Sequence, residues 1–216
     1  MALALSSLVA RPARAQCVDE ELREQLVGRR AYRGVVERKF QKALRHELSP
    51  MGGWWAADVA DGAPMYGGAY TFHFSEDLGL EASYFRTEQR YTLLESVIDR
   101  QQGLVGLTES PAEPVNLFLG HLVWSLAYGK VRWLGGAIGR FDFQLSLGAG
   151  AVDVPGSTGI AGSGGFGMKF YLAQWLALRL DVRDLVRSQR APLGTDALVN
   201  DVSLLGGLSV FLPFSS

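Results

Sequence analysis

Several kinds of protein can be set aside because the sequence lacks what they require. It holds one cysteine, Cys17, so no disulfide can form within the chain. No apolar run reaches the roughly 18 residues that a transmembrane helix needs, so none is expected. The formal net charge is −1, which gives no reason to expect nucleic-acid binding. These absences leave a membrane β-barrel open, because each strand of such a barrel gives only a weak signal.

Histidine is also scarce, and no cluster of residues suggests a metal or a cofactor. The three histidines, His46, His73 and His121, show no H-x-x-x-H spacing, so a metal site is not expected. The run Gly162–Gly167 fits the G-x-G-x-x-G pattern of dinucleotide-binding proteins. That function requires a strand before the glycines and a helix after them. Here a loop precedes and an alternating segment follows, so the glycines are interpreted as barrel residues and no cofactor is predicted.

What the sequence does contain is alternation, and it is clearest between Leu176 and Arg183. Large aliphatic residues at 176, 178, 180 and 182 are separated by Ala177, Arg179, Asp181 and Arg183. Successive side chains of a strand point to opposite faces, so this segment has one apolar face and one mostly charged face. Such a strand must separate an apolar medium from a polar one.

Eight alternating segments are predicted as strands, and the 26 glycines and 11% aromatic residues also favour an all-β fold. We predict an eight-stranded antiparallel up-and-down transmembrane β-barrel over residues 43–213. Alternation alone would equally fit a soluble, lipocalin-like ligand-binding barrel with its apolar face inside. The predicted strands are residues 43–56, 66–75, 79–87, 115–126, 139–152, 162–172, 176–183 and 198–212.

The connections and the aromatic residues favour lipid on the outside. The second-to-third and sixth-to-seventh connections are short, and those after strands three, five and seven are longer, as in outer-membrane barrels. Aromatic residues gather near the predicted strand ends, which indicates girdles at the two membrane interfaces. The predicted girdle residues are Trp54, Trp55, Tyr66, Phe74, Tyr128, Trp133, Tyr171, Trp175 and Phe211.

The polar face balances positive and negative residues, which also favours lipid outside. A closed lumen requires this balance, because an unpaired buried charge costs several kcal/mol. An eight-stranded barrel leaves room only for side chains in its interior. We therefore expect a lumen closed by ion pairs and not a general porin. The predicted ion-pair plug consists of Arg45, Glu47, His73, Glu81, Arg140, Asp142, Lys169, Arg179, Asp181, Arg183 and Asp201.

The same alternation predicts the pairing of the second and third strands. Apolar residues must lie opposite apolar residues on the same face. A two-residue turn would place His73 opposite Leu80 and so mix the faces. A three-residue turn over Glu76–Leu78 places His73 opposite Glu81, and this register is predicted.

The short turn Ala173–Trp175 predicts an unfavourable pair on the next hairpin. It places Lys169 directly opposite Arg179, and like charges in that position repel. Acidic residues from other strands are therefore expected close to the pair. The candidates are Asp142, Asp181 and Asp201.

The N-terminal residues are predicted to lie outside the barrel. Residues 1–16 begin apolar and contain Ala13-Arg14-Ala15, a small-x-small pattern, so they are predicted as a secretory signal peptide. Residues 17–42 are expected to form a short periplasmic helix, Val18–Val27, followed by a basic linker. The linker is interpreted as solvated, with contact to anionic lipid or a partner as the alternative.

Four stretches carry a resemblance to a known family. They are RKFQKALRHELSP at 38–50, GAYTFHFS at 68–75, HLVWS at 121–125 with YGK at 128–130, and LALRLDVRD at 176–184. Together they resemble a family of small bacterial outer-membrane β-barrel domain proteins, over residues 38–213. Two departures are Leu126, where a proline is expected, and the end Phe214-Ser215-Ser216, where many barrels end on the aromatic residue itself.

The resemblance implies an outer-membrane barrel of a Gram-negative bacterium, with no catalytic residues to carry over. Some relatives take part in envelope-spanning gliding-motility assemblies, which implies a structural or partner-binding role. The expected partners are membrane lipid and other cell-envelope proteins, and no nucleic acid. The enzymatic alternative is a lipid-modifying barrel with His73, Glu81 and Ser83 as a triad, although a structural ion pair is the favoured interpretation of these residues.

Overall fold

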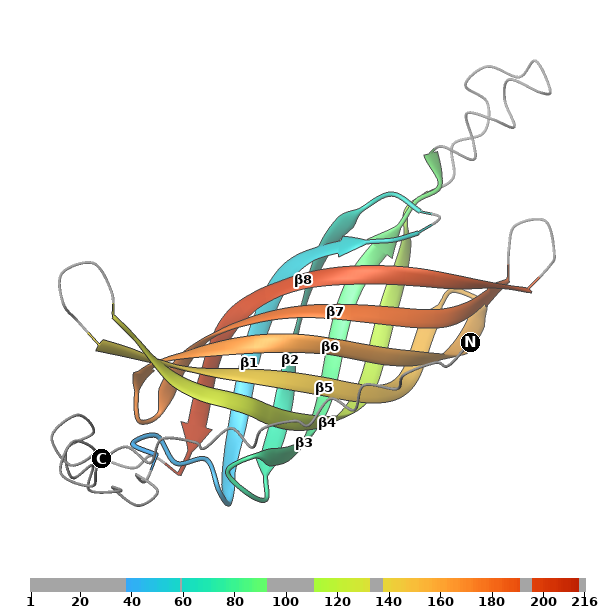
Figure 1. Cartoon of the computed structure of the whole chain (residues 1–216). Helices are drawn as coiled ribbons and strands as arrows, with labels where there is room; N and C mark the ends of the chain where they lie inside the picture. Colours follow the sequence, from blue (N-terminus) through green and yellow to red (C-terminus); the bar gives the residue numbers. More distant parts are fainter. Residues whose placement is uncertain (1–37, 59, 93–110, 133–137, 191–195, 214–216) are drawn as a thin grey trace, which may run out of the picture. The chain divides into compact units, whose positions relative to one another are not determined.

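The eight strands of the computed structural model form one closed barrel, in which each strand pairs antiparallel with the next and β8 pairs with β1 (Figure 1). The predicted all-β, eight-stranded, up-and-down fold is therefore confirmed. The strands are β1 (Arg45–Ala56), β2 (Ala63–His73), β3 (Leu78–Gln89), β4 (Glu113–Arg132), β5 (Ile138–Val154), β6 (Ser157–Ala173), β7 (Leu176–Arg190) and β8 (Asp196–Leu212).

The structure describes residues 38–58, 60–92, 111–132, 138–190 and 196–213. The chain divides into two units, residues 1–38 and 39–216, and the barrel belongs to the second. The predicted signal peptide and the predicted helix Val18–Val27 lie outside the described residues. In the described ranges no helix is long and apolar enough to cross a membrane.

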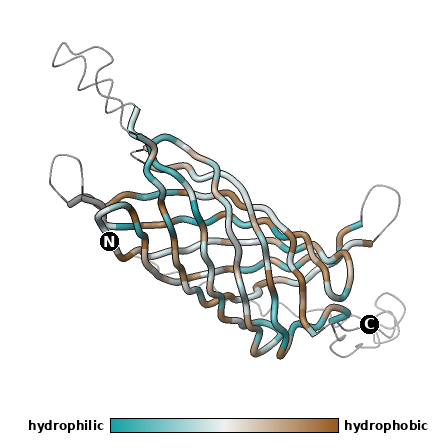
Figure 2. Tube along the Cα trace, turned by 180° about the vertical axis from the view of Figure 1, so that it is seen from behind, coloured by the Kyte–Doolittle hydropathy of each residue, from teal (hydrophilic) through white to brown (hydrophobic). Residues whose placement is uncertain are grey.

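Alternation along the strands places one set of side chains inside the barrel and the other outside. On β7, Arg179, Asp181 and Arg183 are buried, whereas Leu178 and Leu180 are exposed. Figure 2 shows the same interleaving of hydrophobic and hydrophilic residues along the strands. The period-2 pattern of the sequence is therefore the pattern that closes the barrel.

Strand β4 continues past its predicted end at Leu126. The prediction stopped there because a bulge interrupts the alternation of apolar and polar residues. The pairing with β5 shifts register between Ser125 and Ala127, so Leu126 is the extra residue. A bulge inserts one residue into one strand and reverses the parity of the residues after it. The expected connector over residues 127–133 is therefore mostly strand, and β4 runs on to Arg132.

Strands β5 and β6 also extend beyond their predicted ends. The expected loop over residues 155–161 is wrong, because β6 begins at Ser157 and only Pro155 and Gly156 join the two strands. Gly156 has a φ of 81°, a left-handed conformation that glycine adopts without strain. Pro155 and Gly156, two residue types that favour turns, therefore form this tight hairpin connection.

The β2–β3 hairpin has the predicted faces but not the predicted register. His73 lies opposite Gly79, and Glu81 lies opposite Thr71. The pairing differs by two residues from the prediction, which is why apolar residues still face apolar ones. The turn is displaced by one residue towards the N-terminus, and the Ser75 backbone N–H donates to the Leu78 carbonyl across it (3.2 Å).

The β6–β7 hairpin has the predicted pairing, because Lys169 lies opposite Arg179. A second bulge between Tyr171 and Ala173 leaves only residues 174 and 175 between the strands. The like-charged pair predicted from the sequence is therefore present inside the barrel.

The two ends of the barrel differ in their connections. The end where β1 begins and β8 ends, here called the terminal mouth, carries connections 74–77, 133–137 and 174–175. The opposite end, called the distal mouth, carries connections 57–62, 90–112, 155–156 and 191–195. The longest connection is distal, as predicted, but the expected long connection after β5 is wrong, since that hairpin has two residues.

Candidate functional site in the barrel lumen

The centre of the lumen holds a ring of charged side chains contributed by five strands. Glu47 comes from β1, His73 from β2 and Glu81 from β3, while β6 and β7 supply the cations. Each of these side chains is at least nine-tenths buried. We call this group the charged belt, and it consists of Glu47, His73, Glu81, Lys169, Arg179, Asp181 and Arg183.

Glu47 links the basic side chains on one side of the charged belt. Its Oε2 accepts a hydrogen bond from Lys169 Nζ (2.6 Å) and lies 2.7 Å from His73 Nε2. Its Oε1 lies 3.6 Å from Arg179 Nη1. One carboxylate therefore contacts both members of the like-charged Lys169–Arg179 pair, which offsets their repulsion.

Glu81 and Asp181 bind the other side of the belt. Arg179 Nη2 donates to Glu81 Oε2 and to Asp181 Oδ2, both at 2.7 Å. Arg183 Nη2 donates to Glu81 Oε1 (2.8 Å) and to Asp181 Oδ2 (2.7 Å). Thr71 Oγ1 adds a further hydrogen bond to Glu81 Oε2 (3.0 Å). The belt thus sets three carboxylates against three permanent cations, which keeps its net charge near zero.

Gly167 on β6 provides the space that Asp181 occupies. A Cβ atom at this position would overlap the Asp181 carboxylate oxygen and the Gln144 amide nitrogen. An added methyl group would have to displace these side-chain ends, so the glycine is favoured here by a close approach within the lumen and not by a turn.

The terminal mouth is filled by a segment that precedes β1. Lys42 is buried, and its Nζ contacts the Asp142 carboxylate and the Ser125 hydroxyl. Phe40 stacks on Tyr171 with ring centroids 4.8 Å apart. The side chains of Phe40 and Lys42 therefore enter the barrel mouth, where ring stacking and a buried ion pair hold them.

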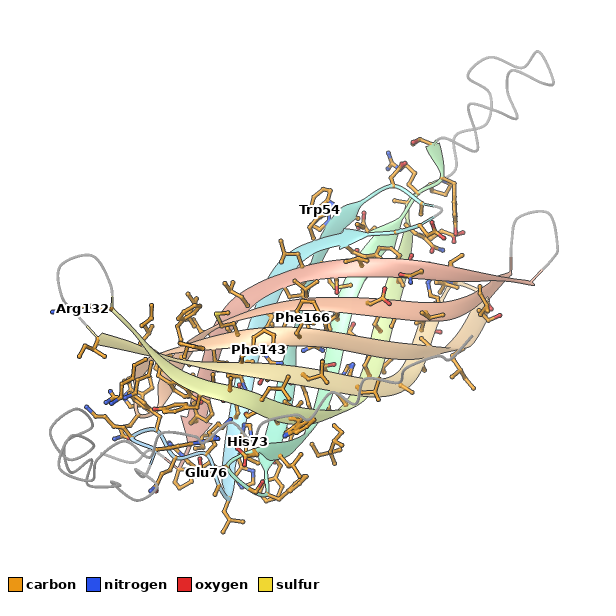
Figure 3. The ribbon with its side chains drawn as sticks, viewed as in Figure 1. Trp54, His73, Glu76, Arg132, Phe143 and Phe166 are labelled. Carbon is orange, nitrogen blue, oxygen red and sulfur yellow. The ribbon has the colours of Figure 1, made fainter. Side chains whose placement is uncertain are left out.

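Backbone contacts fix the same segment to the rim. The Glu76 carboxylate accepts hydrogen bonds from the backbone N–H groups of Lys42 (3.1 Å) and Ala43 (3.0 Å). Leu44 has a φ of 59°, and its N–H donates to the His73 carbonyl (2.7 Å). The chain thereby turns from the mouth into β1, and Figure 3 shows Glu76 at this end of the barrel.

On the distal side of the charged belt, the lumen holds mainly apolar side chains, together with the buried Arg187–Asp201 ion pair. A cluster of buried hydrophobic side chains fills most of this level, and the cavity that remains beside them is about 10 Å³. That space is of the order of a single water molecule. The expectation of a lumen closed by ion pairs alone is therefore incomplete. This apolar layer consists of Met51, Trp55, Met65, Phe85, Val115, Leu117, Leu119, Val152, Ala161, Leu185 and Leu205.

The outer surface of the barrel is apolar on every strand. Phe143 and Phe166 lie side by side on the outside of β5 and β6, with ring centroids 6.2 Å apart (Figure 3). A charged belt inside and an apolar surface outside is the arrangement of a transmembrane β-barrel and the reverse of a soluble one. Exposed residues, one from each strand in order, are Leu48, Tyr70, Leu80, Leu122, Leu147, Phe166, Leu180 and Leu204.

Solved structures of similar architecture include outer-membrane β-barrels. The crystal structure of Neisserial surface protein A is 14% identical and has a TM-score of 0.44, with 76% of this chain and 96% of that chain covered. OprG from Pseudomonas aeruginosa is 12% identical with a TM-score of 0.44, covering 83% and 100%. The N-terminal barrel domain of OprF from Pseudomonas aeruginosa is 12% identical with a TM-score of 0.42, covering 78% and 99%.

These likenesses concern barrel architecture alone, and no argument about function rests on them. No protein-family model matches the chain, and no curated protein matches it in sequence.

The structure brings seven of the predicted plug residues together in the charged belt and places the other four elsewhere. Asp142 pairs with Lys42 at the terminal mouth, and Arg140 lies over the Phe40 ring at 5.6 Å. The other two, Arg45 and Asp201, make separate contacts. Arg45 donates to the carbonyls of residues 174 (2.9 Å) and 213 (2.8 Å), and Asp201 accepts from Arg187 (2.7 Å).

The expected acids around Lys169 and Arg179 are only partly those predicted. Asp181 is one of them, whereas Glu47 and Glu81 take the places expected for Asp142 and Asp201. Glu47 and Glu81 come from strands across the lumen, so the pairing of neighbouring strands could not identify them.

Four of the predicted girdle residues point outward, and the structure places others inside. Trp54, Tyr66, Phe74 and Trp175 are exposed, and Figure 3 shows Trp54 pointing away from the barrel. The girdle assignment is wrong for Trp55, Tyr171 and Phe211, which are buried in the lumen, and Tyr128 packs against that terminal cluster. Adjacent residues such as Trp54 and Trp55 cannot share a face of a strand. Trp133 lies outside the described residues.

The residues of the enzymatic alternative do not assemble as a triad. His73 pairs with Glu47, and Glu81 is occupied by two arginines. The Ser83 hydroxyl lies 3.4 Å from Arg183 Nη1 and not against a histidine. Within the described ranges, no group of three metal-ligating side chains is present either.

Sequence reasoning missed two cations of the lumen. Lys42 was grouped with the basic linker, because it precedes the first alternating segment. Arg187 lies on β7 beyond the predicted end of that strand, at the same parity as Arg183. Extending the alternation of β7 by four residues would have found it.

Proposed function

We propose that this chain is an integral outer-membrane β-barrel with a structural or partner-binding role in the cell envelope and a closed lumen. The observation that carries the proposal is the inverted polarity, with buried charges in the lumen and an apolar exterior on all eight strands. In water, side chains such as Leu147, which is 71% exposed, and Leu204, which is 59% exposed, would form a continuous apolar surface. Soluble monomers rarely expose such a surface.

Three layers in series support a closed lumen. From the terminal mouth these are the Phe40–Tyr171 stack with Lys42, the charged belt and the apolar layer. A general porin has many more strands and a water-filled interior, whereas eight strands enclose space that side chains fill. The soluble ligand-binding alternative is disfavoured by the same packing, since about 10 Å³ within the apolar layer holds no ligand.

A role in binding partners is the finer part of the proposal. The basic residues between Arg29 and Lys39 are the candidates for a contact with anionic lipid or an envelope protein. Membership of an envelope-spanning assembly, such as those of gliding motility, is supported only by the resemblance of four sequence stretches. The enzymatic alternative is not supported by the contacts of His73, Glu81 and Ser83.

Membrane fractionation with gel migration tests the proposal. The chain should be recovered from the outer-membrane fraction and should migrate differently before and after boiling, because a closed barrel resists detergent until it is heated. Reconstituted vesicles should show no ion conductance above that of empty vesicles. Recovery of folded protein from the soluble periplasm without detergent would contradict membrane insertion, and stable conductance steps would contradict the closed lumen.

A further inference from the structure

The β4–β5 hairpin projects beyond the other strands at the terminal mouth. Strand β3 pairs with β4 only as far as Trp124, which lies opposite Leu78. Strand β4 then continues to Arg132 and, from Ala127 onward, pairs with β5 alone among the described strands. Figure 1 shows the ends of these two strands extending past the barrel at the left.

One edge of the projecting part of β4 has no partner strand among the described residues. The Ser125 N–H donates to the Asp77 carbonyl (2.7 Å) at the point where β3 begins. Beyond this bond, no described residue pairs with residues 127–132 on the β3 side. Such an edge presents a row of N–H and C=O groups that can pair with another extended chain. We call residues 127–132 the open edge.

The open edge lies in water and not in hydrocarbon. Trp124 and Trp175 are exposed near this end of the barrel, where such side chains mark the membrane interface. The open edge begins beyond Trp124 along β4. An unpaired strand edge does not occur in hydrocarbon, because its backbone groups would have no hydrogen-bond partners. A segment of a water-soluble partner can therefore reach it.

Basic side chains line one face of the projecting hairpin. Lys130 lies directly opposite Arg140, and Arg132 follows on the same face of β4. The Arg140 guanidinium lies 5.6 Å from the Phe40 ring centroid, so this face continues the inner surface of the barrel. Lys130 and Arg132 are exposed, and neither forms an ion pair with a carboxylate of the described ranges.

The like-charged pair Lys130–Arg140 lacks the compensation that the lumen provides for its own like-charged pair. Like charges directly opposite one another on neighbouring strands repel. In the lumen, the Glu47 carboxylate contacts both cations of such a pair. At the mouth, Asp142 is bound to Lys42 instead. An acidic ligand would supply the carboxylates that this face lacks.

We propose that the open edge of β4 binds an extended, acidic segment of another envelope protein as an additional strand. Backbone groups of β4 bind the main chain of the segment, and carboxylates on one of its faces contact Lys130, Arg132 and Arg140. A lipid headgroup could meet the charges but not the row of backbone groups, which favours a peptide. The proposal names the partner class for the proposed partner-binding role, and the access of soluble segments to this mouth rests on that function.

NMR titration of the full-length protein in zwitterionic detergent micelles tests the site. The probe is a synthetic peptide of alternating glutamate and threonine, which places its carboxylates on one face of a strand. It should cause saturable shifts of the backbone amides of residues 127–132 and slow their exchange with solvent. Nuclear Overhauser contacts should join the peptide backbone to β4. A peptide of alternating lysine and threonine should not bind.

Methylation of the peptide backbone separates strand addition from attraction of charge alone. One version of the probe carries N-methyl groups on its glutamate amides, and a second carries them on its threonine amides. Alternate amides of an added strand face its neighbour, so only one version loses its hydrogen bonds to β4. That version should bind at least about tenfold more weakly than the other.

A pair of substitutions tests the basic face. Lys130→Gln combined with Arg132→Gln should weaken peptide binding about three- to tenfold, the contribution of two solvent-exposed ion pairs. Arg86→Gln combined with Arg90→Gln is the matched control and should leave binding unchanged. Both of these arginines are exposed at the distal end of β3, so the control removes the same charge far from the open edge.

Four results would overturn the proposal. The first three are no saturable shifts at residues 127–132 with the glutamate peptide, equal binding of the two methylated versions, and equal weakening by the two pairs of substitutions. The fourth is saturation of the same amides by short-chain phosphatidylglycerol that the peptide does not displace, which would assign the basic face to lipid. The titration needs only a folded barrel in micelles, so its failure is distinguishable from a failure of membrane insertion, which fractionation reports.

Discussion

Replacing Arg179 with methionine should destabilise the barrel by about 3–5 kcal/mol, which is the usual cost of breaking a buried ion pair from one side. Arg179 is fully buried and contacts Glu81 and Asp181 at 2.7 Å and Glu47 at 3.6 Å. Methionine keeps an unbranched apolar stem, so the loss is mainly electrostatic. The charged belt would be left with three carboxylates and two permanent cations, and the folding equilibrium should shift by at least about a hundredfold.

A second substitution separates this charge effect from a loss of packing. Adding Glu81→Gln to Arg179→Met restores the balance of charge, so the double variant should recover at least half of the lost stability. Lys130→Met on an exposed part of β4 is the control and should unfold like the unchanged protein. The measurement is urea unfolding in lipid vesicles, followed by tryptophan fluorescence. Equal stability of the Arg179 and Lys130 variants, or additive losses in the double variant, would refute the reasoning.

Three further changes test other levels of the structure by the same unfolding assay. Lys42→Met should cost about 3 kcal/mol, because it leaves a buried carboxylate unpaired at the terminal mouth, and it should speed proteolysis before β1. Gly167→Ala should cost about 1–3 kcal/mol by displacing Asp181, whereas Gly162→Ala on the same strand, where an added methyl group would meet nothing within 4 Å, should stay within about 0.5 kcal/mol. Leu147→Arg on the apolar exterior should cost about 2–4 kcal/mol in vesicles, and a loss of less than about 0.5 kcal/mol, as for an ordinary surface substitution, would argue against a lipid-facing surface.

The faces of the strands could be predicted from the sequence, because alternation is local. Leu178 and Arg179 are assigned correctly without knowledge of any other strand. Alternation gave the wrong strand end at Leu126, where a bulge reverses the parity. It also gave the wrong register at the turn before Leu78, because two registers that differ by two residues place the same faces together. Such registers differ only in side-chain fit at the turn, which the hydrophobic pattern does not encode.

The partners within the lumen could be predicted only in part, because they are set by the geometry of closure. Glu47 on β1 meets Lys169 on β6 across the interior, a contact that depends on the tilt and stagger of all the strands between them. The sequence indicates that charges must be compensated but not which acid compensates which base. Lys42 could not be predicted, since it reaches Asp142 from a segment outside any strand.

The origin of the charged belt has a consequence for how the barrel can be assembled. The carboxylates of Glu47 and Glu81 come from the first three strands, while Lys169, Arg179 and Arg183 come from the sixth and seventh, where Asp181 offsets only one of them. Within the charged belt, either group alone would carry two uncompensated charges of one sign, at a cost of several kcal/mol each in hydrocarbon. The belt becomes neutral only where the first strands meet the last ones, so its charge balance depends on closure of the ring.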